Sequence, residues 1–205
     1  MMRFTRKDAL LLIPSFFLAC LLAPAFLWVF GQYYAYTLYM GWLASGVRGG
    51  YWRLPAPLAA ELAPHYADDL SSASYAFTAN LPADLAVADC TTVYFGDSAI
   101  VAHLRAGSPL APKETRWLAH ELTHGEQCGR WGGRREFAKT WFAQAGEQAR
   151  RVIGRGRAAA AIGEYLRTEN VAELHDAMPM EKEGDERARI VSDAFSRMPS
   201  SGMQP

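Results

Sequence analysis

Residues 113–130 constrain the fold more than any other segment, because their start, end and interior all favour one α-helix. Pro112 suits the first helical position, where the N–H that proline lacks would be unpaired anyway, and Gly132-Gly133 ends the helix. The interior holds the sequence His120-Glu121-Leu122-Thr123-His124. Residues four apart share one helix face, so both imidazoles can reach one ion. The sequence therefore predicts a helix that binds a metal ion.

A zinc ion that catalyses a reaction needs a third protein ligand and an open fourth position. Some families supply a histidine six residues after the second, but that position here is Arg130, which cannot bind zinc. Glu181 and Asp185 are four apart, so Glu181 is predicted to bind the ion and Asp185 to hold a ligand histidine by its free ring N–H. Glu183 is expected to point away. The alternatives are an ordinary charged helix face, or ligation by another acid: Glu164, Glu169 or Glu173.

The His-Glu-x-x-His motif with the later Glu-x-x-x-Asp resembles gluzincin-type zinc metallopeptidases. The run over residues 118–127, L-A-H-E-L-T-H-x-x-Q, is more similar still to a group of uncharacterised bacterial peptidase-like proteins. This resemblance covers roughly residues 70–196 and implies that His120, His124 and Glu181 bind Zn²⁺. It implies that Glu121 is the catalytic base. Related proteases often carry alanine where this chain has Gly184, a difference expected to cost helix stability but no chemistry.

The resemblance implies a zinc metalloendopeptidase whose partner is a peptide or protein substrate. Glu121 would take a proton from the attacking water and pass it to the leaving amine, while a histidine or tyrosine donor stabilises the oxyanion. His175 is the preferred donor; Tyr165 and Tyr94 are other candidates, and a surface or capping role is the alternative for His175. Two other functions stay open: a non-catalytic zinc-binding module that docks a partner protein at the membrane, and a membrane-tethered protein without metal.

The N-terminal region is predicted to anchor the chain in a membrane. Three basic residues precede an uncharged, almost uninterrupted apolar run over residues 9–30, which is long enough to cross a bilayer as a helix. The preceding charge places the catalytic domain outside the cytoplasm, at a bacterial inner membrane. The alternative is a secreted protein after signal-peptide cleavage at Ala23-Pro24-Ala25. The aromatic stretch over residues 32–47 is expected at the membrane surface; if it crossed the membrane instead, the domain would face the cytoplasm.

We expect an α+β fold: a mainly helical, zincin-like domain with a small antiparallel sheet, after an N-terminal transmembrane helix. The domains would be an anchor at 1–31, a membrane-proximal segment and linker at 32–56, the zincin-like domain at 57–198 and a disordered tail at 199–205. Strands are predicted at 74–78 and 91–95, the latter as a substrate-binding edge strand, and 99–104 is a third strand or a loop. Helices are predicted at 58–70, 113–130, 136–152, 158–174 and 178–198.

Charge and cysteine content complete the expectations. Lys+Arg and Asp+Glu both number 21, so there is no basic field to attract phosphate, and no nucleic-acid partner is predicted. Cys20 lies within the apolar run, which leaves Cys90 and Cys128 in the domain. Outside the cytoplasm these two can form a disulfide, which would tie the strand before the metal helix to the end of that helix; two buried free thiols are the alternative.

Overall fold

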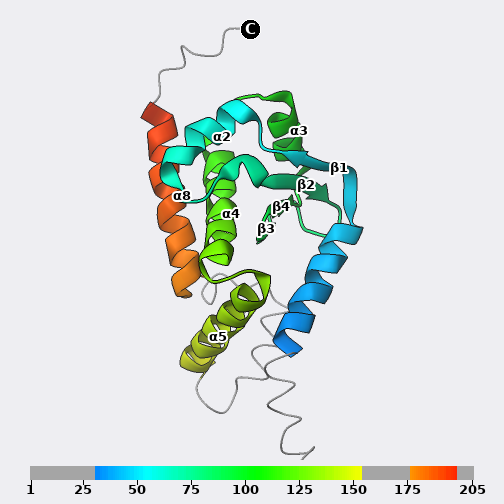
Figure 1. The fold of residues 1–205 in the computed structure, drawn as a ribbon, viewed down its shortest axis with the longest axis vertical. Helices are drawn as coiled ribbons and strands as arrows, with labels where there is room; N and C mark the ends of the chain where they lie inside the picture. The colour runs from blue at the N-terminus through cyan, green and yellow to red at the C-terminus, as the bar shows by residue number, and fades with distance from the viewer. Residues whose placement is uncertain (1–30, 154–175, 198–205) are drawn as a thin grey trace, which may run out of the picture.

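The computed structural model describes residues 31–153 and 176–197, which form an α+β fold of helices around one small sheet (Figure 1). A first helix covers residues 31–45. The elements that follow are β1 (Val47–Arg53), α2 (Ala56–Leu62), η1 (Ala63–His65), η2 (Leu70–Ser72), β2 (Ser74–Thr78), β3 (Ala86–Asp89), β4 (Thr92–Phe95), α3 (Ser98–Ala106), α4 (Pro112–Arg130), α5 (Arg134–Ile153) and α8 (Pro179–Arg197). The predicted α+β class is confirmed for this part of the chain.

The sheet is mixed, so the prediction of an antiparallel sheet is wrong. Its strand order is β1-β2-β4-β3; β2 pairs with β4 in parallel, and the other two pairings are antiparallel. After β2, the chain passes the position of β4 and forms β3 at the edge. The tight β3–β4 connection then returns β4 into the gap, where it runs parallel to β2. For the same reason β3, and not the segment at 91–95, is the edge strand.

Three local predictions are wrong. The helix expected at 58–70 is α-helical only to Leu62, as part of α2, and continues only as the short 3₁₀ helix η1 to His65. The linker expected within residues 32–56 contains strand β1, which pairs with β2 through a register shift between Arg48 and Trp52. Gly49 and Gly50 have positive φ angles of 80° and 101° within this irregular stretch, which is why breaker residues occur inside a strand. The segment at 99–104 is helical, as part of α3, whose start is capped by Asp97 and whose end is a left-handed glycine.

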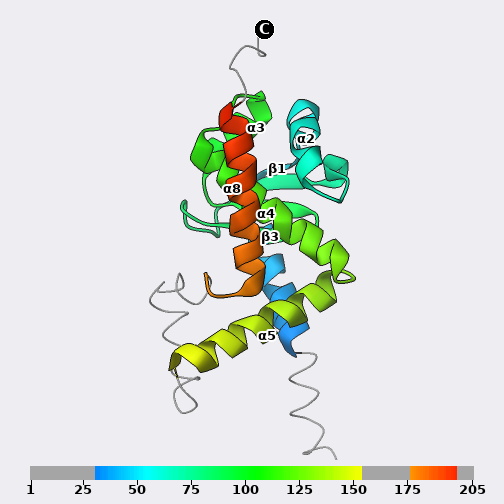
Figure 2. The ribbon, with the colours of Figure 1, turned by 90° about the vertical axis from the view of Figure 1, so that its left-hand side faces the viewer.

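The three long helices lie where the sequence places them. Pro112 is the first residue of α4, and its missing N–H costs nothing there. Gly132 and Gly133 follow α4 with φ angles of 91° and 104°, which a residue with a side chain rarely adopts. Figures 1 and 2 both show α8 packed alongside α4 over most of its length, whereas α5 crosses beneath the two. The α4–α8 pair therefore juxtaposes two segments separated by about fifty residues of sequence.

Apolar packing holds α4 between the sheet and the helices. Leu118 and Leu122 of α4 belong to a buried cluster with Val93 and Phe95 of β4. A second cluster joins Cys128 to Phe137 of α5 and to residues of the helix at 31–45; the partly buried Trp141 packs against it, as expected for a core stripe. The core therefore fixes α4 on both sides of its axis.

Several predictions fall on residues outside those that the structure describes. They are the apolar run at 9–30, the helix at 158–174, His175 and the tail at 199–205. Within residues 31–153 and 176–197, no helix combines the length and the apolarity that a membrane span requires.

Candidate metal centre

Local contacts fix where α4 and α8 begin. The Glu114 carboxylate accepts the Ala111 N–H at 2.7 Å, which satisfies one of the unpaired donors at the start of α4. At the start of α8, the Met180 N–H donates to Oε1 of Gln144, in α5, at 3.0 Å. Because each helix begins at a defined residue, the side chains that follow on the two helices face each other in a defined register.

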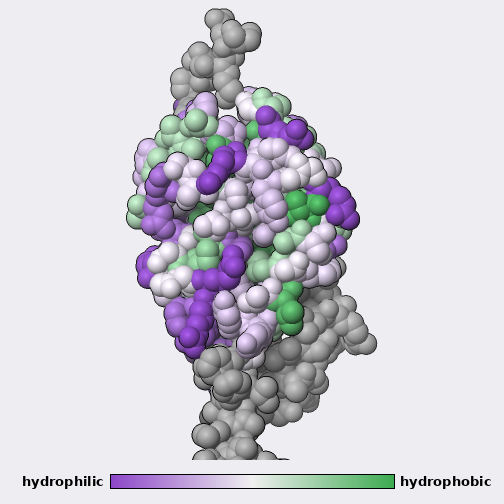
Figure 3. Space-filling view, turned by 45° about the vertical axis from the view of Figure 1, so that its right-hand side comes forward, coloured by the Kyte–Doolittle hydropathy of each residue, from purple (hydrophilic) through white to green (hydrophobic). Residues whose placement is uncertain are grey.

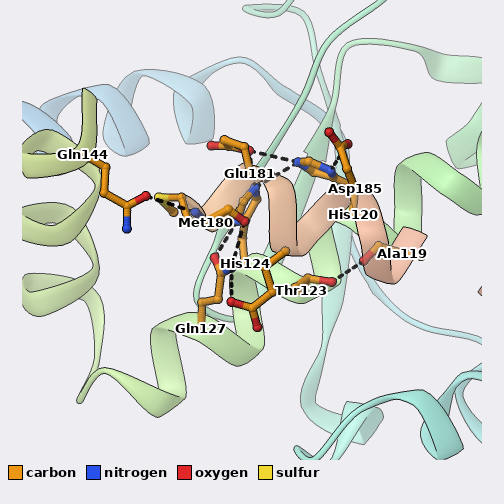
Figure 4. A network of polar contacts seen from close by, with 10 residues as sticks. Ala119, His120, Thr123, His124, Gln127, Gln144, Met180, Glu181 and Asp185 are labelled. Atoms are coloured by element: carbon orange, nitrogen blue, oxygen red, sulfur yellow. Dashed lines mark hydrogen bonds and ion pairs between the residues drawn. The ribbon is translucent and has the colours of Figure 1, made fainter. Parts of the chain in front are cut away.

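Three ligand-type atoms from these helices converge on one point (Figure 4). Nε2 of His120 and Nε2 of His124 lie 3.1 Å apart. One carboxylate oxygen of Glu181, Oε2, lies 3.1 Å from the first and 3.0 Å from the second. All three side chains are buried, and Glu181 is only 2% exposed. The two imidazoles and the carboxylate therefore form a nearly equilateral triangle inside the protein.

The second nitrogen of His124 is a donor, which fixes the state of the ring. Gln127 donates its amide N–H groups to the Met180 carbonyl at 3.0 Å and to Oε2 of Glu183 at 3.1 Å. Its oxygen must then be the atom 2.9 Å from Nδ1 of His124, so that nitrogen carries the hydrogen. In the neutral ring, Nε2 of His124 consequently presents a lone pair to the triangle.

The same reasoning applies to His120. Oδ1 of Asp185 lies 3.1 Å from Nδ1 of His120, and an ionised carboxylate only accepts hydrogen bonds. Nδ1 therefore donates, and Nε2 of His120 also presents a lone pair to the triangle. The Asp185 side chain is 57% exposed, so this contact lies at the solvent edge of the site. The structure thus places Asp185 beside His120, one of the two histidines that the sequence predicts as metal ligands.

The triangle fits a metal ion. With both Nδ1 atoms occupied as donors, it consists of three acceptors facing one another, an arrangement that a cation or a proton must neutralise. Ligand atoms at about 2.0–2.1 Å from a tetrahedral zinc ion lie about 3.3–3.4 Å apart, only a few tenths of an ångström more than the distances here. His120, His124 and Glu181 are accordingly a buried group that could hold a metal ion.

In the absence of a metal ion, a proton on His124 can neutralise the triangle instead. Burial lowers the pKa of His124, but the hydrogen bond that its ring donates to Glu181 and the charges of Glu181 and Glu121 outweigh it and raise the pKa to about 9. A metal ion that binds at neutral pH must therefore displace a proton.

A network behind His124 was missed by the sequence analysis. Glu183, which accepts from Gln127, also forms a bidentate ion pair with Arg130, at 2.8 and 2.7 Å. The hydrogen bonds from Arg130 lower the pKa of Glu183 and keep it ionised. Glu183 lies outside the ligand triangle, as expected, but it contacts α4. The sequence did contain a signal for this network, because Gln127 and Arg130 follow His124 at intervals of three residues along one face of the helix.

The expectation that Gly184 affects only helix stability is wrong. A Cβ atom at this position would lie 2.9 Å from Cε1 of His120 and 3.0 Å from its Nδ1. The glycine lets α8 approach the imidazole of a metal-ligand candidate, so the residue at this position affects the site and not helix stability alone.

Glu121 lies on a different side of α4 from the triangle. Its side chain is 5% exposed and lines a cavity of about 70 Å³ between α4, the β3–β4 connection and the segment around η2. His120, His124 and Glu181 do not line this cavity. Glu121 is nevertheless close enough for its charge to help raise the pKa of His124. The Glu121 carboxylate thus lines this cavity and is also close enough to His124 to affect its pKa.

Other predicted site features are placed as follows. Cys90, after β3, is joined to Cys128 of α4 by the predicted disulfide, with Cα atoms 5.2 Å apart. Tyr94 is buried in the sheet and meets Tyr51 edge to face. His103 pairs with Glu114 at 2.9 Å, a structural contact. His175, Tyr165 and the alternative acids Glu164, Glu169 and Glu173 lie outside the described residues.

The fold and the triangle define a class of site, a buried two-histidine, one-carboxylate group on facing helices. Comparison with known proteins adds no closer assignment: no family model, no curated protein and no solved structure matches the chain.

Proposed function

We propose that the protein is a zinc-dependent metallopeptidase. The single observation that carries the proposal is the triangle of His120, His124 and Glu181 with Glu121 next to the first histidine. Two imidazoles and one carboxylate, with each imidazole held by a second hydrogen bond, are the ligand set of one class of catalytic zinc site. The histidine nitrogens favour zinc over magnesium or calcium, which prefer oxygen ligands.

Each residue has a distinct part in the proposed reaction. Zinc, when bound, supplies a Lewis acid that lowers the pKa of water and polarises a peptide carbonyl. Glu121 accepts the proton of the attacking water and delivers it to the leaving amine, because it is a carboxylate close to the ligands but outside the triangle. Asp185 and Gln127 hold the rings of His120 and His124 in the orientation that keeps both Nε2 lone pairs on the site. His175 stays our candidate for the oxyanion donor.

Strand β3 is the element best placed to hold an extended peptide. It forms an edge of the sheet, it packs against α4, and its end lines the cavity that Glu121 also lines. A peptide can add to such an edge through main-chain hydrogen bonds.

The decisive test combines metal analysis with one isosteric substitution. The wild type is expected to bind one zinc per chain and to cleave peptides in a fluorogenic library. Glu121→Gln should keep the zinc and lose about 10²–10⁴-fold in cleavage rate, because the proton acceptor is gone. Glu136→Gln, at a half-exposed position of α5 where Glu136 pairs with Lys139 of the same helix, is the matched control and should cleave at the wild-type rate. Cleavage by Glu121→Gln at that same rate would refute the role of Glu121.

A specific observation favours a second candidate, a non-catalytic zinc module that docks a partner. The three ligand residues are at most 9% exposed, and the cavity beside Glu121 does not include them. The two functions differ in the fourth position around the ion. In the cobalt-substituted protein, acetohydroxamate should change the visible spectrum if that position is open, as the peptidase requires. An unchanged spectrum, together with no peptide cleavage, would favour the docking module.

A further inference from the structure

The helix at 31–45 has two faces that serve different purposes. Tyr36, Met40 and Leu43 are buried, at 7%, 5% and 0% exposed, and lie on the protein side. Tyr34, Leu38 and Trp42 follow one another at four-residue spacing on another face and are 62%, 74% and 49% exposed. Seven large apolar or aromatic side chains are exposed among the described residues, and this helix contributes four of them: Tyr34, Leu38, Tyr39 and Trp42. We call these four residues the aromatic face.

The helix is fixed firmly to the domain that carries the metal site. The Tyr36 hydroxyl donates to Asp89 at 3.2 Å, and Asp89 also pairs with Arg134 of α5. At the other end, the Leu43 carbonyl accepts from the Thr78 hydroxyl at 2.7 Å. An exposed apolar face of a loosely attached helix could fold away, but this face keeps one orientation relative to the domain.

The surrounding sequence indicates what the aromatic face contacts. No charged residue occurs between Asp8 and Arg48, so the apolar run at 9–30 leads directly into this helix without a polar break. Tyrosine and tryptophan are the residues enriched where a membrane-embedded segment meets water. In Figure 3, the described surface next to the grey residues at the bottom of the view is hydrophilic on the left and pale to hydrophobic on the right. A water-exposed helix would carry charged residues on such a face.

We propose that the aromatic face lies in the headgroup region of a lipid bilayer and holds the metal-binding domain at a fixed orientation on the membrane. Leu38 and Trp42 enter the boundary between headgroups and acyl chains, while Tyr36, Met40 and Leu43 stay packed in the protein. The membrane contact is then part of the folded domain and not only a property of the segment before it. This inference does not depend on the metal or on peptidase activity.

Tryptophan quenching in the full-length chain tests this surface. The chain is reconstituted in nanodiscs of phosphatidylcholine and phosphatidylglycerol, with and without brominated acyl chains that quench nearby tryptophan. Of the six tryptophans, the proposal places Trp28 and Trp42 in or at the lipid. Trp42→Phe should therefore about halve the lipid-quenched part of the emission. Trp117→Phe is the control, because Trp117 packs against Phe95 in the core of the domain and should leave the lipid-quenched part unchanged.

Each other outcome identifies a different occupant and overturns the proposal. If Trp42 is quenched by aqueous iodide and not by brominated lipid, the aromatic face is open to water. If neither quencher reaches Trp42, the face is covered by protein, either by residues 1–30 of the same chain or by a second copy. Trp42→Phe is a conservative change at a half-exposed position, so the fold is retained in the comparison.

Discussion

Helix α4 buries two kinds of surface, and their difference shows how the chain separates stability from function. Leu118 and Leu122 lie in an apolar cluster with strand β4. His120, His124 and Gln127 are also buried, yet they face polar and ionised groups of α8. Apolar burial stabilises a fold by itself, whereas burial of polar groups is costly unless every group finds a partner.

The polar side of α4 meets this requirement through hydrogen bonds and ion pairs. Among the described residues, no buried side-chain nitrogen or oxygen lacks a hydrogen-bond partner. The amide of Gln127 makes three hydrogen bonds, and Arg130 neutralises Glu183. Only the ligand triangle gathers acceptors around a common point. The comparison therefore predicts that substitutions on the polar side change metal affinity more than stability, and substitutions on the apolar side do the reverse.

The largest expected effect is the loss of the anionic ligand. Glu181→Gln keeps the side-chain volume and lets an amide N–H donate to a histidine lone pair, so the metal-free fold should survive. Zinc affinity should fall about a thousandfold, because a binding free energy of about 10–16 kcal/mol is shared among a few ligands. Competition with a fluorescent chelator measures this change.

The matched control for Glu181→Gln lies on the apolar side of α4. Leu118→Ala should lower the free energy of unfolding by about 2–5 kcal/mol and leave the zinc affinity unchanged. The contrast between the two sides of the helix fails if Leu118→Ala weakens zinc binding as much as Glu181→Gln does.

A smaller effect is expected behind the ligands. Gln127→Met removes the acceptor of the His124 N–H while filling similar space, and should weaken zinc binding about 10–100-fold, as loss of such supporting hydrogen bonds typically does. Gln127→Glu restores the acceptor but places a second carboxylate beside Glu183. The cobalt-substituted protein should show an altered visible spectrum in Gln127→Met. An identical spectrum and affinity would mean that Gln127 only fills space.

The pH dependence follows from the raised pKa of His124. In the metal-free protein, protonated His124 stabilises the fold fully below its unfolded value of 6.5, and this contribution is lost as pH rises through about 9. Zinc must displace that proton, so zinc affinity should rise about tenfold per pH unit from pH 7 and level off above about 9. Calorimetry in buffers of different ionisation enthalpy counts the released proton. A pH-independent affinity from 7 to 8.5 would contradict this linkage.

The long helices could be read from the sequence because their signals are local. Pro112 and Gly132-Gly133 bound α4 by backbone chemistry, and the spacing of His120 and His124 needs only helix geometry. The distant partner Glu181 was accessible for a chemical reason, since two histidines require a third ligand. The packing of α8 against α4 brings Glu181 to within 3.1 Å of His120, and the motif alone does not determine that packing.

The missed elements depend on pairing or on signals that compete. Strand β1 contains Gly49 and Gly50, and glycines inside a segment disfavour a strand. Here both have positive φ angles and lie where the register against β2 shifts, which the sequence alone does not show. The parallel pairing of β2 with β4 arises because the chain forms β3 at the edge of the sheet before β4 inserts beside β2, and no residue pattern encodes that path. Helix α3 carried readable signals, a capping Asp97 and a final Gly107, but its β-branched residues favoured a strand.

Gly184 gives the smallest expected effect and the sharpest test of how closely α8 approaches the site. Alanine favours a helix interior over glycine by about 1 kcal/mol, yet its Cβ would lie 2.9 Å from Cε1 of His120. Gly184→Ala should therefore gain little stability and weaken zinc binding about fivefold, since overpacking of about 1 kcal/mol falls on a ligand. Gly146→Ala, inside α5 with no atom within 4 Å of the added carbon, should gain about 1 kcal/mol and leave zinc affinity unchanged. If the two variants changed stability and zinc affinity equally, α8 would have shifted to accommodate the added carbon, and its close approach to His120 would not matter for zinc binding.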